Sequence, residues 1–357
     1  MNPTGTLILE DGSTFSGSVF GFPASVAGEV VFTTGMTGYS EALTDPSYAG
    51  QILTFAYPLI GNYGIPGPSV DEYGVYNHFE SRKIHVKAVI LSEWCTHHNH
   101  WNARTSFESW LQQGRIPGIS GIDTRALTVK LREKGVMLGK VVISEDIDFV
   151  DPNKENLVKA VSRENPVELG TGETRIVVVD CGVKNSIVRN LLNRNAQVVI
   201  VPWNYDFTDK DYDGVLLSNG PGDPATCQET IAIVQKVIEQ EIPLFGICLG
   251  HQLLALAAGA RSFKLPYGHR GQNQPVATAE KRGFITAQNH GFAVDTSTLS
   301  PEWGQLFYNV NDYTNEGIYH KHLPFFSVQF HPEGCCGPRD TDYLFDTFVK
   351  MADAHAR

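Results

Sequence analysis

The second half of the chain alternates short apolar runs with segments of helical periodicity. Runs rich in Val, Ile and Leu lie at 175–180, 196–202, 212–218 and 242–247. Segments whose apolar residues recur at helical spacing lie at 185–195, 228–241 and 250–260. Because strands buried on both faces have continuous apolar runs, this alternation predicts a doubly wound, mostly parallel sheet with flanking helices. Ligands of such domains bind at the carboxyl ends of the strands.

The first half has a different pattern, in which short strand-like runs are broken by Gly, Pro and Thr. Asp11-Gly12 lies between two such runs and predicts a hairpin. Two later segments, 106–114 and 123–135, have helical spacing. This mixture predicts an α+β domain.

The two patterns meet across a polar stretch. We expect an N-terminal α+β domain at 1–150, a linker with one short helix at 151–174, and the doubly wound domain at 175–357. The fold class is therefore α/β, with a second domain of α+β type.

Charge and composition exclude several classes of protein. The formal net charge of -11 provides no basic excess for binding nucleic acid or an anionic membrane. No apolar stretch is long enough to span a bilayer, and the first residues lack the pattern of a secretory signal. The six cysteines form no regular framework, so we expect reduced thiols and a cytoplasmic location.

The sequence "FGICLGHQLL" joins a predicted buried strand to a predicted helix. Its Gly246-x-Cys248-x-Gly250 has the spacing of a nucleophile elbow, with cysteine in place of serine. At the helix N-terminus, backbone N–H groups and the helix dipole favour a thiolate, and the N–H of Leu249 can stabilise an oxyanion. The same pattern also suits a small cysteine packed at the edge of a sheet, so the motif alone leaves both interpretations open.

A base for this cysteine is offered by "FFSVQFHPE", an apolar run that ends in His331-Pro332-Glu333. Residues two apart on a strand point to the same side, so Glu333 can orient His331 while His331 faces a nucleophile. A surface turn is the alternative for the three residues taken alone. Together with the elbow, they indicate a Cys–His–Glu triad.

Three other motifs resemble known binding sites but do not match them fully. Gly220-x-Gly222 in "SNGPGDP" imitates a dinucleotide fingerprint, but its prolines favour a rigid loop that offers N–H groups to a substrate. The segment 135–141 falls one residue short of a phosphate-binding loop, and no nucleotide site is predicted. The histidines of "CTHHNHW" fit no zinc spacing, so we expect a solvated loop there and no metal.

At these motifs the chain resembles the triad-type (class I) glutamine amidotransferases. More narrowly, nearly its full length is similar to the glutaminase subunit or domain of carbamoyl-phosphate synthase. The first half carries "GEVVFTTGMTGYSEALTDPSY" and "YPLIGNYGI", which other class I glutaminases lack; the second half carries "SNGPGDP", "GHRGQNQPV", "QNHGFAV" and "FFSVQFHPE".

The resemblance implies a role for each matched residue. Cys248 would attack the side-chain amide of L-glutamine, and His331, oriented by Glu333, would transfer the protons. The family's oxyanion and glutamine contacts correspond to Ser47, Gly220, Gly222, Leu249, Gln252, Asn289, Gly291 and Phe292. Ammonia-using relatives lack the cysteine, so the presence of Cys248 indicates glutamine as the nitrogen donor.

The resemblance also implies a partner. With no cofactor of its own, the chain would deliver ammonia to a large carbamoyl-phosphate synthetase subunit, or to a fused synthetase domain, which uses ATP, magnesium and bicarbonate. The product would serve pyrimidine or arginine synthesis. Two alternatives are a glutaminase subunit of another class I amidotransferase, against which the N-terminal domain argues, and a non-catalytic regulatory scaffold, against which the intact triad argues.

Overall fold

A computed structural model describes residues 3–356, which form two compact units. Unit 1 consists of the chain up to Asp71 and of Tyr76–Lys154. Unit 2 consists of Glu72–Val75 and of the chain from Glu155 onward. Each unit has its own core.

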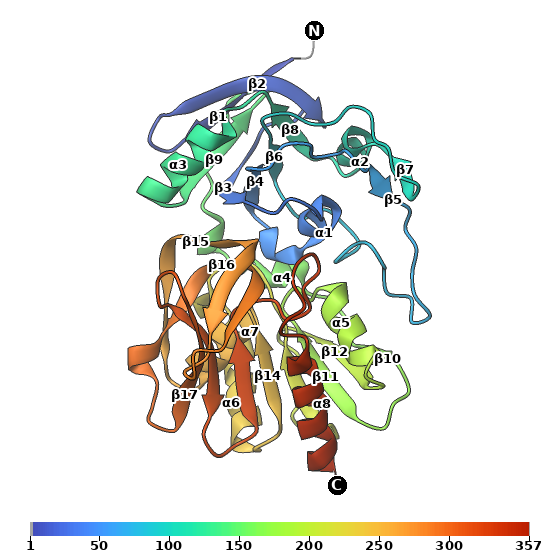
Figure 1. Cartoon of the computed structure of the whole chain (residues 1–357), viewed down its shortest axis with the longest axis vertical. Coiled ribbons are helices and arrows are strands. Elements are labelled where there is room, and N and C mark those ends of the chain that lie inside the picture. Colours follow the sequence, from blue (N-terminus) through green and yellow to red (C-terminus); the bar gives the residue numbers. More distant parts are fainter. Residues whose placement is uncertain (1–2, 357) are drawn as a thin grey trace. The chain divides into compact units, whose positions relative to one another are not determined.

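Unit 1 is built around a closed β-barrel with the strand order β1-β2-β8-β6-β4-β3-β9 (Figure 1). Its strands are β1 (Thr4–Leu9), β2 (Thr14–Gly21), β3 (Val26–Thr33), β4 (Gln51–Phe55), β6 (Ala88–Ile90), β8 (Pro117–Ser120) and β9 (Met137–Val142). The small strands β5 (Ile65–Pro66) and β7 (Ala103–Thr105) pair outside it. Its helices are α1 (Tyr39–Thr44), α2 (Phe107–Gln113) and α3 (Thr124–Lys134), with 3-10 turns at Pro46–Tyr48 and Pro152–Lys154.

Alternation along the barrel strands creates two apolar clusters. On β3, Val30 and Phe32 face one cluster and Val31 faces the other, because successive strand residues point to opposite sides. The first cluster also holds Leu127 of α3, and the second holds Phe107 of α2. The predicted hairpin and the helices α2 and α3 are confirmed, whereas closure of the strands into a barrel was not anticipated.

Unit 2 contains a ten-stranded sheet with the order β10-β12-β11-β13-β14-β19-β18-β17-β15-β16. Its strands are β10 (Val167–Leu169), β11 (Arg175–Asp180), β12 (Gln197–Pro202), β13 (Gly214–Leu217), β14 (Leu244–Ile247), β15 (Arg261–Ala277), β16 (Gly283–Asp295), β17 (Trp303–Asn309), β18 (Asn315–His320) and β19 (Phe325–Val328). Its helices are α4 (Val158–Val161), α5 (Asn185–Leu192), α6 (Gln228–Glu239), α7 (Leu249–Ala257) and α8 (Tyr343–Ala356), with 3-10 turns at Pro224–Thr226 and Thr296–Thr298.

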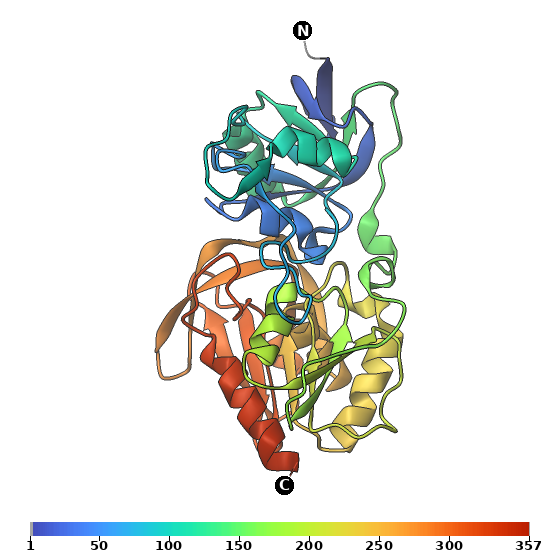
Figure 2. The same cartoon turned by 90° about the vertical axis from the view of Figure 1, so that its right-hand side faces the viewer.

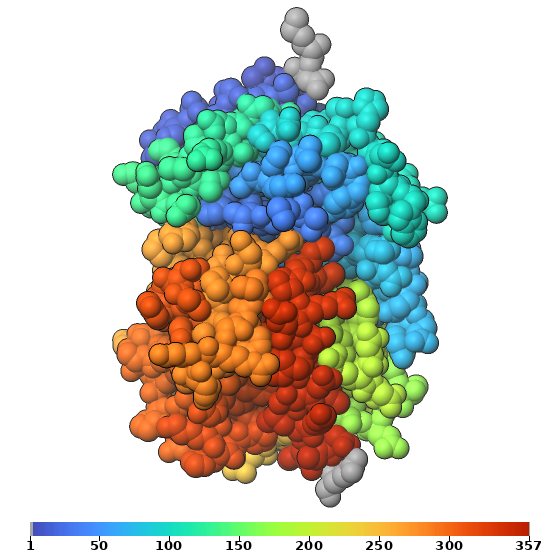
Figure 3. Space-filling view, viewed as in Figure 1, coloured from blue at the N-terminus to red at the C-terminus, as the bar shows by residue number. Residues whose placement is uncertain are grey.

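Helices cover both faces of this sheet. Apolar side chains of α6 and α7 pack on one face, and those of α5 and α8 pack on the other. Figure 2 shows the helices on the two sides of the sheet. The helix α8 lies beside α5 at the surface seen in Figure 3. The doubly wound arrangement is thus confirmed.

The sheet is mixed, and its parallel part is narrower than the sequence predicts. The five strands β12, β11, β13, β14 and β19 run parallel, whereas β10 on one side and β15 to β18 on the other pair in antiparallel fashion. The segment 151–174, where only one short helix was expected, also contributes β10 to the edge of the sheet. Antiparallel strands can follow one another through short turns, which leaves no crossover helix as a signal.

Candidate functional site

Cys248 occupies a strained turn between β14 and α7. Its φ of 55° and ψ of -104° are unusual for a residue with a side chain. The residue is the N-cap of α7, it is 2% exposed, and its backbone N–H donates to the carbonyl of Val328 at 2.9 Å. The turn fixes the sulfur at the carboxyl end of a central parallel strand, as the elbow motif predicts.

The two glycines of the motif are required by close backbone contacts. A Cβ on Gly246 would lie 2.6 Å from the carbonyl oxygen of Gly250, and a Cβ on Gly250 would lie 2.2 Å from that of Leu217. Neither contact is possible for a real side chain, and each opposing atom belongs to the backbone. Any larger residue would therefore push the helix away from the strands and displace Cys248.

His331 reaches the same edge of the sheet because β19 runs parallel to its neighbour β14. Its backbone N–H donates to Ala287 at 2.9 Å, and its Nδ1 lies 2.7 Å from Oε1 of Glu333. The predicted pairing of His331 with Glu333 is present, but β19 ends at Val328, so the pair forms in the turn after the strand and not along a strand face. Within residues 3–356, Nε2 of His331 has no hydrogen-bond partner of ordinary geometry, yet the side chain of Cys248 is close enough to raise the pKa of His331. Such loose alignment is common before a substrate binds.

Buried charges set the protonation of this group. Burial opposes the charged form of His331, but the carboxylate of Glu333 and the thiol of Cys248 outweigh it and raise the pKa of His331. Burial would also raise the pKa of Glu333, but Lys184 and His331 lower it to about 2. Lys184 Nζ lies 2.8 Å from Oε1 of Glu333 and 2.9 Å from the carbonyl of Cys335. Glu333 is therefore an anion held between two cations.

Lys184 is the residue that sequence analysis missed in this group. It precedes α5 at the carboxyl end of β11, which is the edge where ligands of doubly wound sheets bind. Its place after a predicted strand was the one pointer that the sequence offered, and a single lysine there forms no motif. Its side chain is only 5% exposed, which a lysine rarely is without a buried partner.

Four of the predicted glutamine contacts lie on α7 and β16, and one of them touches Cys248. The sulfur of Cys248 lies 3.7 Å from the carbonyl oxygen of Asn289, and the buried Nδ2 of Asn289 has no partner among the described residues. Gln252, one turn along α7, donates through Nε2 to the carbonyl of Phe292 at 3.0 Å. Gly291 lies between Asn289 and Phe292 on β16.

The loop after β13 lies beside the elbow. A Cβ on Gly220 would be 2.7 Å from Cδ2 of Leu249, so the loop and the start of α7 are in contact. Gly222 has a φ of 87°, which suits glycine. The N–H of Leu249 belongs to the first turn of α7, where N–H groups have no helical acceptor.

Ser47 belongs to unit 1. It lies in the 3-10 turn Pro46–Tyr48, it is buried, and its N–H donates to Oδ1 of Asp45 at 2.9 Å. Its role as a glutamine contact stays a prediction.

A second buried cluster of histidine and glutamate was not predicted. His269 on β15, His290 on β16 and Glu316 on β18 offer ligand atoms that lie within 4.8 Å of one another. Burial, together with the positive charges of neighbours such as His269 and Arg270, lowers the pKa of His290 well below its usual value, so its ring is neutral. The histidines of "CTHHNHW" lie in exposed loop positions, as expected.

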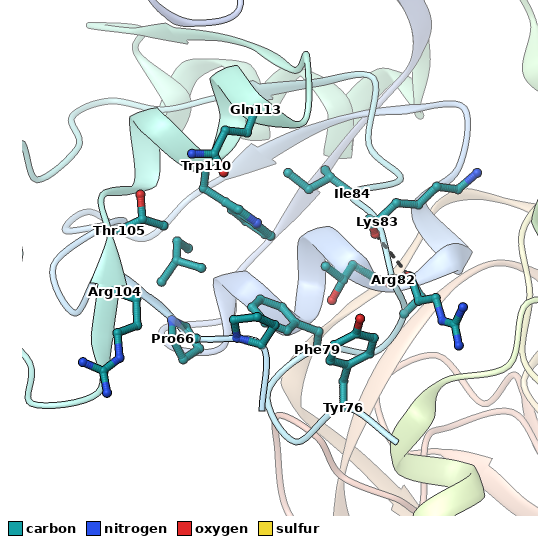
Figure 4. A pocket seen from close by; sticks show the side chains of 15 residues that line it. Pro66, Tyr76, Phe79, Arg82, Lys83, Ile84, Arg104, Thr105, Trp110 and Gln113 are labelled. Atoms are coloured by element: carbon teal, nitrogen blue, oxygen red, sulfur yellow. Dashed lines mark hydrogen bonds between the residues drawn. The ribbon is translucent and has the colours of Figure 1, made fainter. Parts of the chain in front are cut away.

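A cavity of about 270 Å³ lies in unit 1 (Figure 4). Aromatic side chains, among them Phe79 and Trp110, line it, and the charged ends of Arg82, Lys83 and Arg104 point outward from it. None of the predicted site residues lines this cavity. Its apolar interior and outward-pointing cations match neither glutamine nor the triad chemistry.

Comparison with known protein families defines the class of unit 2 first. Residues 177–351 match the family described as "Glutamine amidotransferase class-I". Residues 7–141 match "Carbamoyl-phosphate synthase small chain, CPSase domain". The chain therefore belongs to the small-chain family of carbamoyl-phosphate synthases, whose glutaminase part is a class I glutamine amidotransferase domain.

Curated relatives are similar along almost the whole chain. The multifunctional protein CAD of Squalus acanthias is 52% identical over 97% of this chain and 16% of the relative. The mitochondrial carbamoyl-phosphate synthase (ammonia) of Rattus norvegicus is 52% identical over 98% of this chain and 24% of the relative. The chain thus spans a quarter or less of the length of these two relatives. A solved glutamine amidotransferase from Thermotoga maritima matches 52% of this chain and all of its own, with 16% identity and a TM-score of 0.41.

The helices of both units are short or amphipathic. Across residues 3–356, no helix is both long enough and apolar enough to span a membrane.

Proposed function

We propose that the chain hydrolyses the side-chain amide of L-glutamine to glutamate and ammonia through a thioester on Cys248. The observation that carries this proposal is the position of Cys248, on a strained turn beside the buried pair of His331 and Glu333. Nucleophile, base and orienting carboxylate in this order are the components of a catalytic triad. The class I glutamine amidotransferase family of unit 2 supports glutamine as the substrate.

The reaction proceeds in two steps. The thiolate of Cys248 attacks the amide carbon, and the protonated ring of His331 gives its proton to the nitrogen as the C–N bond breaks and ammonia leaves. Water then attacks the γ-glutamyl thioester, His331 takes a proton from that water, and the C–S bond breaks to release glutamate. The raised pKa of His331 suits the first step, because the ring begins it as the acid.

Glu333 and Lys184 serve this chemistry by position and charge. Glu333 holds Nδ1 of His331 at 2.7 Å, so Nε2 is directed toward the nucleophile. Lys184 keeps the buried carboxylate ionised. An ionised Glu333 stabilises the imidazolium that forms when His331 accepts a proton.

Backbone and polar side chains would bind the substrate. The N–H groups of Leu249 and of the loop at Gly220 and Gly222 would hold the oxyanion. Ser47, Gln252, Asn289, Gly291 and Phe292 would contact glutamine. The unpartnered Nδ2 of Asn289 supports this, because a buried amide donor without an acceptor suits a ligand oxygen.

We further propose that the ammonia passes to a carbamoyl-phosphate synthetase subunit or fused domain, which uses ATP, magnesium and bicarbonate. The match of residues 7–141 to the synthase small chain supports this partner. So do the two relatives described above, which are at least four times longer than their matched part. The same comparison supports pyrimidine or arginine synthesis as the pathway that consumes the product.

The domain division and the location are proposed as well. We assign an N-terminal domain to 1–150, a linker to 151–174 and the amidotransferase domain to 175–357. Among the described residues no cysteine forms a disulfide, which suits the reducing cytoplasm. Microscopy of the tagged protein in its native cell would test this location, and mitochondrial localisation would contradict it.

The decisive experiment is Cys248→Ser in the native synthase complex or fused protein. Glutamine-dependent synthesis should fall by at least about 10³-fold, because a serine hydroxyl lacks the nucleophilicity of the thiolate. Synthesis with added ammonia should continue at the wild-type rate, which serves as the internal control for folding. Glutaminase activity retained by the serine variant would contradict the role of Cys248. Absence of any large ATP-using partner or fused domain would contradict the proposed recipient.

A further inference from the structure

The second buried cluster contains more lone pairs than hydrogen atoms to satisfy them. Nδ1 of His290 lies 2.8 Å from the carbonyl oxygen of Phe292, which can only accept, so this nitrogen carries the hydrogen. In the neutral ring, Nε2 of His290 is therefore a lone pair. That lone pair lies 3.9 Å from Oε1 of Glu316 and 3.2 Å from the amide oxygen of Gln288, and both of these atoms are acceptors.

One ring nitrogen of His269 also faces Glu316. Nε2 of His269 lies 2.8 Å from the carboxylate of Asp312, which fixes a hydrogen on that nitrogen. Its other nitrogen, Nδ1, lies 3.2 Å from Oε1 of Glu316. The side-chain amide of Asn309 approaches the same pair, at 3.1 Å from Glu316 and 3.4 Å from Nδ1 of His269.

Glu316 is the third residue of the cluster. It is fully buried, and its Oε2 has no hydrogen-bond partner among the described residues. One proton on Nδ1 of His269 would satisfy the contact with Oε1, but it would leave Nε2 of His290 and Oε2 of Glu316 without donors. Buried acceptors without donors are costly in free energy, and a bound cation removes that cost by accepting their lone pairs.

We propose that His269, His290 and Glu316 form a zinc-binding site. Two imidazole nitrogens and one carboxylate oxygen form a ligand set that zinc prefers, with bond lengths of about 2.0–2.2 Å. Ligands of a tetrahedral zinc at those lengths are roughly 3.4 Å apart, close to the 3.2 Å between His269 and Glu316. The wider pairs close by small rotations of the side chains.

The surroundings of both histidines match those of metal ligands. A ligating histidine commonly donates its other N–H to a carboxylate or a backbone carbonyl, which orients the ring. Asp312 supplies the carboxylate for His269, and Phe292 supplies the carbonyl for His290. A divalent ion would also balance the charges of Asp312 and Glu316 with both rings neutral.

The site would be structural and would stiffen three strands of the sheet. The ligands come from the antiparallel pair β15 and β16 and from β18, which β17 separates from β15 in the sheet, so the ion would join strands that are not all hydrogen-bonded to one another. β15 and β16 form the outer edge of the sheet (Figure 1). Zinc binding at this place would be independent of the proposed glutamine hydrolysis.

The test measures zinc in the full chain, purified without a metal-affinity tag. The background is Cys248→Ser, which removes the one thiol of the predicted triad as a competing ligand. We expect about one zinc per chain by mass spectrometry of the metal content. Excess zinc should raise Tm by roughly 5–10 °C at about 100-fold above Kd.

Single variants show how much each residue contributes to zinc binding. Glu316→Gln and His290→Asn should lose the bound zinc and the Tm rise, whereas Asp312→Asn should weaken affinity by about 10- to 100-fold. His98→Asn, in the exposed loop of unit 1, is the matched control and should keep wild-type zinc content. A chain that takes up no zinc from excess metal, or a Glu316→Gln variant with wild-type zinc content, would overturn the proposal. Circular dichroism of each variant separates lost binding from lost folding.

Discussion

Unit 2 contains two buried pairs of histidine and glutamate, His269 with Glu316 and His331 with Glu333. The pKa of one glutamate is raised and that of the other is lowered. Burial disfavours the ionised form of both carboxylates. For Glu316 burial prevails over the charge and hydrogen bond of His269 and the hydrogen bond of Asn309, and its pKa is raised. For Glu333 the cation of Lys184 lies 2.8 Å away, and with His331 it lowers the pKa to about 2.

The difference shows what ionises a carboxylate in a protein interior. At Glu316, His269 and the amide of Asn309 compensate only part of the lost hydration, whereas at Glu333 Lys184 and His331 together reverse the balance. A triad needs its carboxylate as an anion, because only then does the carboxylate stabilise the imidazolium. Lys184 therefore distinguishes the catalytic pair from the other pair.

The largest expected effect comes from changing one histidine of each pair. His331→Asn should lower kcat for glutamine hydrolysis by at least about 10³-fold, because it removes the proton-transferring group. His269→Asn should also lower kcat, but the fold-loss should be at least about 100 times smaller than the fold-loss in His331→Asn. Steady-state kinetics on both variants measure this ratio, and equal losses would mean that the two pairs act as one catalytic unit.

Removing the cation should have the next largest effect. Lys184→Met leaves the buried carboxylate of Glu333 with His331 alone and removes its permanent cation, which should cost about 3–5 kcal/mol of unfolding free energy. Urea unfolding of unit 2 measures this loss. The double variant Lys184→Met/Glu333→Gln removes both charges and should recover most of the stability. If the single and double variants were equally unstable, the loss would come from packing and not from charge.

Acid should weaken the same pair. The pKa of Glu333 is about 2 in the folded chain, against 4.5 for an ordinary glutamate, so the folded state binds this proton less readily than the unfolded state. The stabilisation is therefore complete above pH 4.5 and is lost as pH falls toward 2, to a total of roughly 3 kcal/mol. Urea unfolding of the wild type and of Lys184→Met/Glu333→Gln across this range measures it. A stability difference that does not shrink on acidification would contradict the assignment.

The smallest expected effect comes from Gln252, which shares a hydrogen-bond acceptor with the second cluster. The carbonyl of Phe292 accepts from Nδ1 of His290 and from Nε2 of Gln252, so it belongs to both networks. Gln252→Ala removes one or two neutral hydrogen bonds, which should raise KM for glutamine by about 5- to 30-fold. The value of kcat should change less than KM. A fall in kcat with unchanged KM would place Gln252 in the chemical step and not in substrate binding.

The catalytic group was accessible from sequence because its parts are local or lie on parallel strands. The elbow around Cys248 is a contiguous motif, and His331 and Glu333 are two residues apart just after β19. The second cluster was not accessible. His269, His290 and Glu316 lie on long antiparallel strands, and the register of β15 against β16 shifts on both sides of His269 and Arg270. Such bulges break the alternation on which a prediction of facing residues depends.

Other elements show the same limit. The barrel of unit 1 closes through pairs such as β1 with β9, which lie far apart in sequence and leave no local signal. The strand β10 is only three residues long, Val167–Leu169, and it lies exposed at an edge of the sheet. Lys184 was missed for a different reason, since one lysine after a strand gives no motif.

The close contacts of Gly246 and Gly250 separate two kinds of information in the elbow motif. Both glycines are fixed by backbone oxygens of Gly250 and Leu217, and these contacts exist whatever side chain stands at position 248. A descendant of this chain that lost its nucleophile would therefore still need both glycines in order to fold. In a newly sequenced relative the pair of glycines would identify the architecture, and the residue between them would tell an active copy from a silent one.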